Sequence, residues 1–436
     1  MARRREGMKE HLRWLKDRGE LLVIDREVNP NFEASSILKR EDGRCAVLFK
    51  NVKGADLPLA GNLITKREYL LKAVGASRDS EAYSKLLYAM SNPTRPEVVE
   101  PTEYKVVADL SGLPLLRFYE KDGGPYITSA IFVARDPDLA VQNASIHRVM
   151  VVGSRRAVVR IVPRHLYRIL KKSEARGEEL PVAVVIGSKP AVYVAAASSP
   201  PYGVDELHVA NTLLGGTLKV FEEPRTGLLV PTDFQVMIVG RLNPWEKERE
   251  GPFTDITGTY DIVREQPVLK IDAVYVRPEA LFYAILPAGM EHKILMGFPR
   301  EAAIWDSVRR VTPEVKAVRL TPGGCGWLHA VISIRKQREG EPKNVILAAL
   351  AAHPSLKLVV VVDDDINVDD PVDIEWAIAT RFQPDKDLVV ISGVRGSSLD
   401  PSADQVSYLT SKWGLDATRP IDRPLEHFIK ARIPWP

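Results

Sequence analysis

The chain has 436 residues, of which 45% are hydrophobic and 27% charged, and its formal net charge is +3. This length predicts two or three domains, and the small net charge, without a long basic stripe, argues against a nucleic-acid-binding protein. The only cysteines, Cys45 and Cys325, argue against a disulfide framework or a thiolate zinc site.

The apolar runs and the start of the chain indicate a protein that is neither exported nor inserted in a membrane. No apolar run reaches the roughly 18–20 residues that a spanning helix needs. The basic start, Arg3–Arg5, is followed at once by Glu6, unlike an acid-poor transit peptide. We therefore expect a cytoplasmic protein that binds neither nucleic acid nor membranes.

Residues 1–105 mix helical and strand patterns and end in a linker marked by Pro93, Pro96 and Pro101. Helices are expected at 8–18, 31–40, 66–76 and 80–91, and strands at 20–25 and 45–50.

Strand signals dominate residues 106–300. The segments 139–152 and 156–162 flank Gly153-Ser154 and predict a hairpin. A helix is expected at 204–214, where apolar residues share one face and Gly215-Gly216 marks the end. Further strands are expected at 182–186, 191–197, 217–222, 235–241, 259–265 and 268–276.

From residue 301 strands and helices alternate, which indicates an α/β layer. The stretch from Trp413, rich in proline and charge, is expected to wrap across a surface. Strands are expected at 315–320, 328–334, 356–362 and 387–392, and helices at 300–311, 341–352 and 372–379.

The acidic run Asp363–Asp370 follows an apolar strand, so a metal site at the strand's end is one interpretation. It fails the EF-hand pattern, because Val368 stands where the turn glycine belongs. Acidic turns also cap the next helix and pair with nearby arginines, and we favour this structural interpretation.

Two short runs far apart in the chain carry the strongest chemical signal. Asn143–Arg148 offers an amide oxygen, a hydroxyl and a permanent positive charge, and Glu250–Asp255 places two carboxylates around a Gly-Pro turn. A cation beside two carboxylates can hold a substrate carboxylate and separate the proton affinities of the two acids, so that one donates a proton. An ordinary ion pair between Arg148 and Glu250 is the alternative.

Two considerations stand against a single site. Along an unbroken strand positions 143 and 148 point to opposite faces, so a bulge, or a ligand over the strand's edge, is required. Asn143, His165 and Glu206 together would suit a divalent cation, but each one alone is better explained as a polar residue that satisfies local hydrogen bonds.

At these residues the chain resembles the UbiD family of reversible decarboxylases, which use prenylated FMN. The resemblance runs from Leu12 to about Pro420. Its most specific stretches are Asn143-x-Ser-Ile-x-Arg148, Pro201-Tyr-Gly-Val-Asp-Glu206 and Glu250-Gly-Pro-Phe-x-Asp255-x-x-Gly258-x-Tyr260. Further matching stretches lie at 291–297, 361–366, 398–402 and 412–418.

The resemblance implies an α/β (α+β) fold in three parts. These are an N-terminal α/β domain at 1–105, a split β-barrel that binds prenylated FMN at 106–300, and a C-terminal α/β domain at 301–436. It also implies a homodimer or a higher homo-oligomer, supplied with cofactor by a flavin prenyltransferase of the UbiX type.

The resemblance also implies roles for single residues. Arg148, Glu250 and Asp255 match the family's catalytic triad, with Asp255 where some members carry the longer Glu, which leaves the proton-delivery distance open. Arg148 would pair with Glu250 and Asp255 would donate the proton. Mn²⁺ or Mg²⁺ would bind to Asn143, His165 and Glu206 next to the cofactor's phosphate, and Lys412 would reach the same phosphate. K⁺ would bind to backbone carbonyls at Ala196–Ser198. The flavin would be lined by Ser145 and Ile146.

The implied reaction is the non-oxidative decarboxylation of an α,β-unsaturated acid. The compact chain, with His147 inside the Asn–Arg motif, is most similar to the archaeal branch, whose members convert trans-anhydromevalonate 5-phosphate to isopentenyl phosphate. An aryl acid such as polyprenyl-4-hydroxybenzoate is the alternative substrate, and a non-catalytic flavin- or metal-binding protein is the alternative of another class. A phosphorylated substrate needs cations at the pocket mouth, for which Arg155, Arg156, Arg164 and Lys293 are candidates.

Overall fold

The computed structural model describes residues 7–431 and 433–434. The basic start, Arg3–Arg5, lies outside the described residues. The chain forms two compact units, Met1–Pro299 and Arg300–Pro436. The expected division into three domains at residues 105 and 300 stays a prediction.

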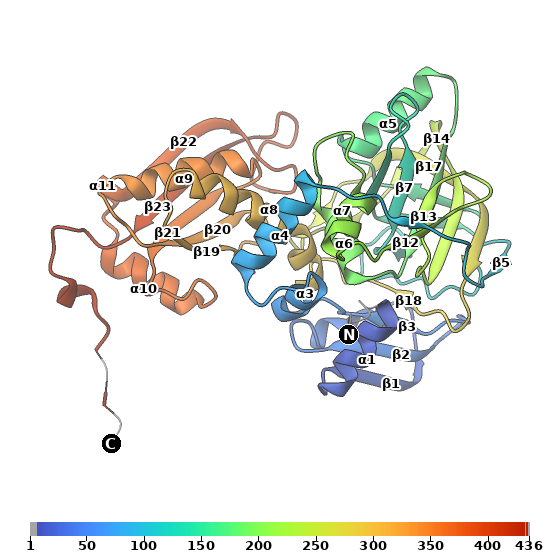
Figure 1. The fold of residues 1–436 in the computed structure, drawn as a ribbon, viewed down its shortest axis with the longest axis horizontal. Helices are drawn as coiled ribbons and strands as arrows, with labels where there is room; N and C mark the ends of the chain where they lie inside the picture. The colour runs from blue at the N-terminus through green and yellow to red at the C-terminus, as the bar shows by residue number, and fades with distance from the viewer. Residues whose placement is uncertain (1–6, 432, 435–436) are drawn as a thin grey trace. The chain divides into compact units, whose positions relative to one another are not determined.

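A small sheet with helices forms the N-terminal part of the first unit (Figure 1). Its elements are α1 (Met8–Asp17), β1 (Leu21–Val28), α2 (Glu33–Arg40), β2 (Ala46–Val52), β3 (Leu59–Gly61), α3 (Arg67–Ala73), α4 (Asp79–Ser91) and β18 (Phe282–Tyr283). The strand order is β1-β2-β3-β18. α1 buries Met8, Leu12 and Leu15, whose spacing places them on one face of the helix.

The candidate site is built on a larger sheet of the first unit. Its strands are β5 (Lys105–Val107), β6 (Tyr126–Ile127), β7 (Ile131–Arg135), β8 (Gln142–Ile146), β9 (Val149–Gly153), β10 (Arg156–Val159), β11 (Leu180–Ile186), β14 (Val236–Glu250) and β17 (Arg264–Val276). The order is β6-β9-β10-β17-β14-β11-β7-β8, and β5 also pairs with β17. Only His147 and Arg148 separate β8, at one end of this path, from β9, near the other. The two ends of the sheet therefore meet at these residues, as a split barrel requires.

The predicted hairpin is confirmed, since β9 and β10 pair antiparallel around Gly153-Ser154. The prediction of one strand at 139–152 is wrong, because the chain changes partners between β8 and β9. The amide of His147 donates to the Ala130 carbonyl, whereas the carbonyl of Arg148 accepts from the Arg160 amide. Two successive residues thus pair with different parts of the sheet.

The prediction of a strand at 191–197 is also wrong, because this segment is the helix α6 (Pro190–Ser198). Pro190 suits the first turn of a helix, and the run Ala195–Ala197 has high helix propensity. All residues of α6 but Ala197 are buried. A segment buried on all sides shows no 3.6-residue pattern, so periodicity cannot separate it from a buried strand.

Two further helices flank the site. The helix α7 (Glu206–Leu213) confirms the helix predicted at 204–214. The carboxylate of Asp205 caps it by accepting from the Leu207 amide at 2.8 Å. The helix α5 (His165–Ala175), which the sequence analysis missed, lies beside β14 and β7 in Figure 1.

Two small sheets complete the first unit. Their strands are β4 (Glu97–Val98), β12 (Lys219–Glu222), β13 (Leu229–Pro231), β15 (Phe253–Thr254) and β16 (Tyr260–Asp261). The first sheet has the order β13-β12-β4, and the second is the hairpin β15-β16.

The second unit is an α/β layer, as the alternating pattern predicted. Its elements are β19 (Val315–Leu320), β20 (His329–Ile334), α9 (Glu341–Ala352), β21 (Leu358–Asp363), α10 (Pro371–Arg381), α11 (Pro384–Asp387), β22 (Leu388–Arg395), β23 (Leu409–Ala417) and the 3₁₀ helix η1 (Leu425–Phe428). The sheet order is β19-β20-β21-β23-β22. The helix α8 (Met290–Arg309) contains the boundary between the units.

The stretch from Trp413 is not a surface wrap over its first residues. Trp413–Ala417 belongs to β23, which pairs parallel with β21 and antiparallel with β22. Because both of its edges are paired, this charged segment lies inside the sheet. Its composition alone does not predict that position. Only the residues after β23 leave the sheet.

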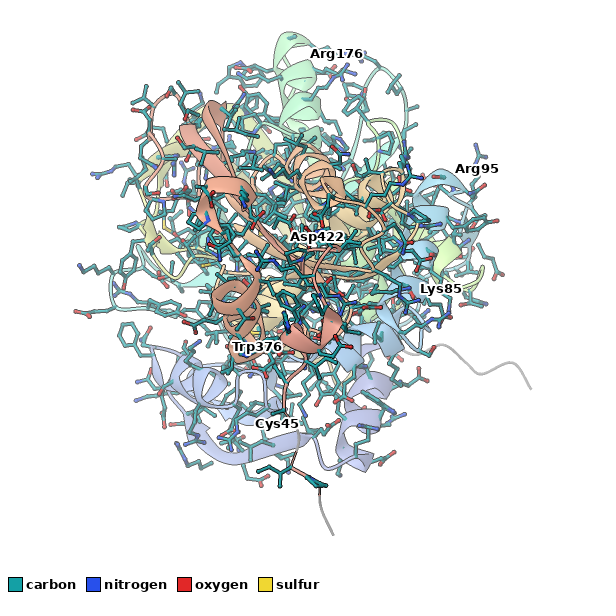
Figure 2. The ribbon with its side chains drawn as sticks, turned by 90° about the vertical axis from the view of Figure 1, so that its left-hand side faces the viewer. Cys45, Lys85, Arg95, Arg176, Trp376 and Asp422 are labelled. Atoms are coloured by element: carbon teal, nitrogen blue, oxygen red, sulfur yellow. The ribbon has the colours of Figure 1, made fainter. Side chains whose placement is uncertain are left out.

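The acidic run after β21 has the structural role that we favoured. Arg381, on α10, donates to Asp363 and Asp365 at 2.6–2.9 Å. The carboxylate of Asp370 caps α10 by accepting from the Val372 amide. Figure 2 labels Trp376 on the same helix, and the Arg381 guanidinium lies 5.1 Å from the centre of its ring. Arg335 pairs with Asp364 and Arg319 with Asp369, so ion pairs and a helix cap engage each carboxylate of the run.

Candidate active site

Arg148 lies at the centre of a buried cluster of carboxylates. Its Nε and Nη2 atoms donate to the two oxygens of Glu250, each at 2.9 Å. Its Nη1 atom donates to Asp255 Oδ2 at 2.6 Å, and Nη2 also donates to Asp261 Oδ2 at 2.9 Å. The structure therefore brings together the three residues predicted to be catalytic and adds a third carboxylate, Asp261.

The end of β14 and the hairpin β15–β16 hold these carboxylates in place. Glu250 is the last residue of β14, and Gly251 then adopts a φ of 97°, in the left-handed region that glycine tolerates best. In the hairpin, Phe253 pairs with Asp261. Asp255 follows β15 directly, so both hairpin carboxylates face the same guanidinium.

The three carboxylates differ in burial and in how firmly they hold Arg148. Glu250 is fully buried and binds through both of its oxygens, whereas Asp255 has a side chain that is 17% exposed and binds through one. Burial alone would lower the pKa of Arg148, but its bonds to Glu250 and the charges of the aspartates raise it above its usual value. Asp255 is thus the carboxylate that can most easily exchange its contact with Arg148 for another partner.

Several residues of the site escaped the sequence analysis. Tyr126 donates to Glu250 Oε1 at 3.0 Å. It packs against Phe253, a residue of the predicted Glu250–Asp255 run, whose ring centre lies 4.6 Å from the guanidinium carbon of Arg148. His292 lies close enough to Asp255 and Arg148 for their charges to act on its ring, and burial lowers its pKa. Asp261 follows one stretch that matches the family and His292 lies within another, so these stretches could have indicated both residues. No pattern in the sequence indicates Tyr126.

The change of partners after β8 removes the objection that positions 143 and 148 face opposite ways. Asn143 and Ser145 lie on β8, while Arg148 comes after that strand has ended. Periodicity along one strand therefore does not apply across His147.

The predicted metal ligands also come together. Asn143 Nδ2 donates to Glu206 Oε1 at 2.8 Å, and His165 Nδ1 lies 3.7 Å from the same oxygen. The other oxygen of Glu206 accepts from the Ala144 amide at 2.7 Å. β8, the start of α5 and the start of α7 each supply one of the three side chains.

The chemistry of this set fits a divalent cation. Burial raises the pKa of Glu206, against the opposing effects of His165 and the Ala144 amide, so a cation would relieve the cost of burying the carboxylate. One amide oxygen, one carboxylate and one imidazole suit Mn²⁺ or Mg²⁺ and leave positions open for phosphate oxygens. In the described part of the chain, no group of three or more His, Cys, Asp or Glu side chains could hold a metal ion. The set Asn143, His165 and Glu206 contains only two residues of these types, and its third ligand would be the amide oxygen of Asn143.

The remaining predicted cofactor residues fall in two places. Ser145 and Ile146 lie at the end of β8, and Ala196 and Ser198 lie in the last turn of α6, where Ser198 Oγ donates to the Ala195 carbonyl. The carbonyl groups at this helix end are available in principle to K⁺, and the potassium site stays a prediction. Lys412 belongs to the second unit, where Nζ donates to the Pro354 carbonyl, and its contact with a phosphate also stays a prediction.

The four cations proposed for a phosphorylated substrate lie at the β9–β10 hairpin, at the start of α5 and at the start of α8. Arg156 forms ion pairs with Glu246 and Glu248, and Arg155 donates to the Ile271 and Asp272 carbonyls. Arg164 precedes His165 at the start of α5. Lys293 lies in the first turn of α8, next to His292.

Comparison with known proteins connects this site to a family. The N-terminal, Rift-related and C-terminal domain models of 3-octaprenyl-4-hydroxybenzoate carboxy-lyase match residues 12–90, 93–290 and 293–417. A protein of Methanothermobacter thermautotrophicus named anhydromevalonate phosphate decarboxylase is 49% identical over 92% of this chain and 95% of its own. A protein of the same name from Aeropyrum pernix is 48% identical over 94% and 93%.

Solved structures agree with these matches. The UbiD-class enzyme HmfF from Pelotomaculum thermopropionicum, in complex with FMN, is 38% identical and superposes with a TM-score of 0.95 over 98% of both chains. An evolved dimeric form of that enzyme, in complex with prFMN, superposes with a TM-score of 0.91 over 98% and 97%. Fold, site and relatives together make the protein a carboxy-lyase. The chain belongs to the UbiD family.

In the part of the chain that the structure describes, no helix is both long and apolar enough to cross a membrane.

Proposed function

We propose that this protein is a prenylated-FMN-dependent decarboxylase that converts trans-anhydromevalonate 5-phosphate to isopentenyl phosphate. The observation that carries the proposal is the buried cluster of Arg148 with three carboxylates, in a chain 48–49% identical to two proteins named anhydromevalonate phosphate decarboxylase. The intact set Arg148, Glu250 and Asp255 speaks against a non-catalytic relative, because such a protein should have lost at least one of the three.

Arg148 receives the substrate's carboxylate. Glu250 occupies the Nε and Nη2 edge of the guanidinium, so a second carboxylate reaches it at Nη1 by replacing Asp255. The Asp255 side chain, released from Arg148, can then turn toward the substrate and act as its proton donor. Glu250 and Asp261 keep Arg148 in position throughout this exchange.

The reaction breaks the bond between the α-carbon and the carboxylate carbon and releases CO₂. Bound prenylated FMN supplies the electron sink for the pair of electrons left on the substrate. Asp255 delivers the proton that forms the new C–H bond at the α-carbon, and Phe253 and Tyr126 pack on the inner side of the site. Asp255 regains a proton from solvent through its partly exposed face.

The cofactor and its ions complete the proposal. Asn143, His165 and Glu206 would hold Mn²⁺ or Mg²⁺, which would bind the cofactor's phosphate to the chain, and Ser145, Ile146 and Arg148 would contact the flavin. Backbone carbonyls at Ala196–Ser198 would hold K⁺. The protein acts in the cytoplasm as a homo-oligomer, with cofactor from a UbiX-type flavin prenyltransferase.

Replacement of either charged metal ligand tests the cation site. His165→Ala and Glu206→Ala are each expected to purify with much less Mn²⁺ and flavin than the wild-type protein, because the cation joins the phosphate to the chain. Metal analysis and flavin absorbance of the purified variants measure this loss. Tyr167→Ala, on the exposed side of the same helix as His165, should retain both. Full occupancy in the two ligand variants would return these residues to a purely structural role.

A product assay tests the substrate. Protein co-expressed with a flavin prenyltransferase should convert trans-anhydromevalonate 5-phosphate to isopentenyl phosphate, detected by mass spectrometry. Turnover of polyprenyl-4-hydroxybenzoate alone would overturn this assignment in favour of the aryl acid.

Lys293→Ala identifies the group that the substrate phosphate contacts. We expect a roughly tenfold or larger rise in KM, because a hydrogen bond to a charged group is worth about 1.5–3 kcal/mol. Lys171→Ala, on α5 with a side chain 46% exposed, is the matched control. An unchanged KM in Lys293→Ala would show that the phosphate binds elsewhere.

A further inference from the structure

We propose that His147 is a positioning residue that holds the hydroxyl hydrogen of Ser145, and so keeps the Oδ1 atom of Asn143 free to bind the divalent cation. This inference rests on the proposed metal site. His147 lies two residues beyond Ser145 and four beyond Asn143, an alternation that places all three side chains on one side of the backbone.

The hydrogen bonds of His147 determine which of its nitrogens carries a hydrogen. Nδ1 lies 3.1 Å from the backbone carbonyl of Arg160, which can only accept, so Nδ1 must donate. Burial, with the nearby charges of Arg164 and Arg160, lowers the pKa of His147 to about 4, and the ring is neutral at physiological pH. In a neutral ring with a hydrogen on Nδ1, Nε2 can only accept.

The hydroxyl of Ser145 therefore stands between two acceptors. Its oxygen lies 2.9 Å from His147 Nε2 and 3.0 Å from Asn143 Oδ1, and it has one hydrogen to give. When the hydrogen points to His147, the oxygen of Asn143 keeps its lone pairs. When it points to Asn143, it competes with a cation for the same oxygen.

The orientation of Asn143 makes this oxygen the relevant one. Its Nδ2 donates to the carboxylate of Glu206 at 2.8 Å. With no cation between the two groups, the reverse orientation would set Oδ1 against that carboxylate as two facing acceptors, so Oδ1 faces Ser145 here. The oxygen of Asn143 that would bind the cation therefore lies beside the hydroxyl of Ser145.

The ring of His147 is held by its surroundings. Phe132 lies edge-to-face against it, with ring centres 5.5 Å apart and an angle of 89° between the planes. Phe132 is the cross-strand partner of Ser145 in the pairing of β7 with β8. The register of these two strands therefore positions both the Phe132 ring and the Ser145 hydroxyl next to His147. His147 therefore presents Nε2 to Ser145 without searching other orientations.

Two variants separate the roles of the two nitrogens. His147→Asn puts its amide nitrogen near the position of Nδ1 and loses the acceptor, whereas His147→Gln can place an amide oxygen near the position of Nε2. Mn²⁺ is titrated into each purified protein, and the free ion is measured by electron paramagnetic resonance. We expect about a tenfold weaker Kd in His147→Asn and a Kd close to the wild-type value in His147→Gln.

The decisive variant adds Ser145→Ala to His147→Asn. Removal of the hydroxyl takes away the competing hydrogen, so the double variant should recover most of the lost Mn²⁺ affinity. A merely structural His147 predicts no such recovery, and absence of recovery overturns the proposal. Thermal unfolding of each variant shows that it is folded.

Glu206→Ala distinguishes failure of this inference from failure of the metal site. If Mn²⁺ binding is lost in Glu206→Ala and unchanged in His147→Asn, the metal site stands and the role of His147 is wrong. If Glu206→Ala binds Mn²⁺ as the wild-type protein does, the metal site itself is wrong, and the inference about His147 is overturned with it.

Discussion

Protein produced without a flavin prenyltransferase is expected to release no measurable CO₂ from any of the proposed substrates. Loss of CO₂ leaves an electron pair on a vinylic carbon, and neither Arg148 nor the carboxylates around it can stabilise that charge. Arg148 is already neutralised by Glu250, Asp255 and Asp261. The measurement is CO₂ release by protein purified with and without co-expressed prenyltransferase.

Reconstitution supplies the control for this prediction. Addition of prenylated FMN and Mn²⁺ to the cofactor-free protein should restore activity, whereas unmodified FMN should bind without restoring it. Decarboxylation by strictly cofactor-free protein would refute the proposed chemistry. It would leave the family membership intact, because that rests on the sequence and the fold.

Replacement of Asp255 by asparagine is expected to lower kcat by roughly 10²–10⁴-fold, the usual contribution of a positioned general acid. The substrate's carboxylate replaces residue 255 at Arg148 in both proteins, and Glu250 still holds the guanidinium, so substrate binding should persist. The measurement is exchange of the product's vinylic hydrogen with deuterated water, which reports the protonation step without CO₂ chemistry. Asp255→Asn should lose this exchange.

Glu250→Gln is the matched variant, because it removes the other predicted carboxylate while keeping one acceptor oxygen. Glu250 binds Arg148 with two charge-assisted hydrogen bonds, and loss of one costs about 1.5–3 kcal/mol. We therefore expect kcat/KM to fall roughly 10–100-fold through weaker capture of the substrate, while exchange survives better than in Asp255→Asn. If Asp255→Asn instead exchanges the hydrogen at the wild-type rate, Glu250 becomes the acid.

The site could be predicted from sequence where its chemistry lies in short runs. Arg148, Glu250 and Asp255 carry charges that have no place in a core unless they meet one another, and the structure brings them together. Asp261 was missed because it stands one residue beyond the matching stretch that ends at Tyr260, and its partner, Arg148, lies 113 residues away. Tyr126 was missed because it meets Glu250 from a strand of only two residues.

Elements were predictable from the sequence where one side faces water and the other the core. The helix α1 alternates buried and exposed residues with the period of a helix, and its boundaries follow from that pattern. The helix α6 is buried on nearly all sides and has no such period, so its sequence suits a buried strand as well. The stretch from Trp413 looked like a surface segment, and only pairing with β21 and β22 makes Trp413–Ala417 part of a sheet.

By itself, the sequence determined the family, the alternation of strands and helices in the C-terminal part and which residues carry charge or can bind a cation. Only the tertiary structure decided which of those residues meet. The break between β8 and β9 turns Asn143 toward Glu206 and Arg148 toward Glu250, although five positions separate the two in the chain. The physical reason is that strand pairing and burial depend on partners distant in sequence, and a local pattern contains no information about them.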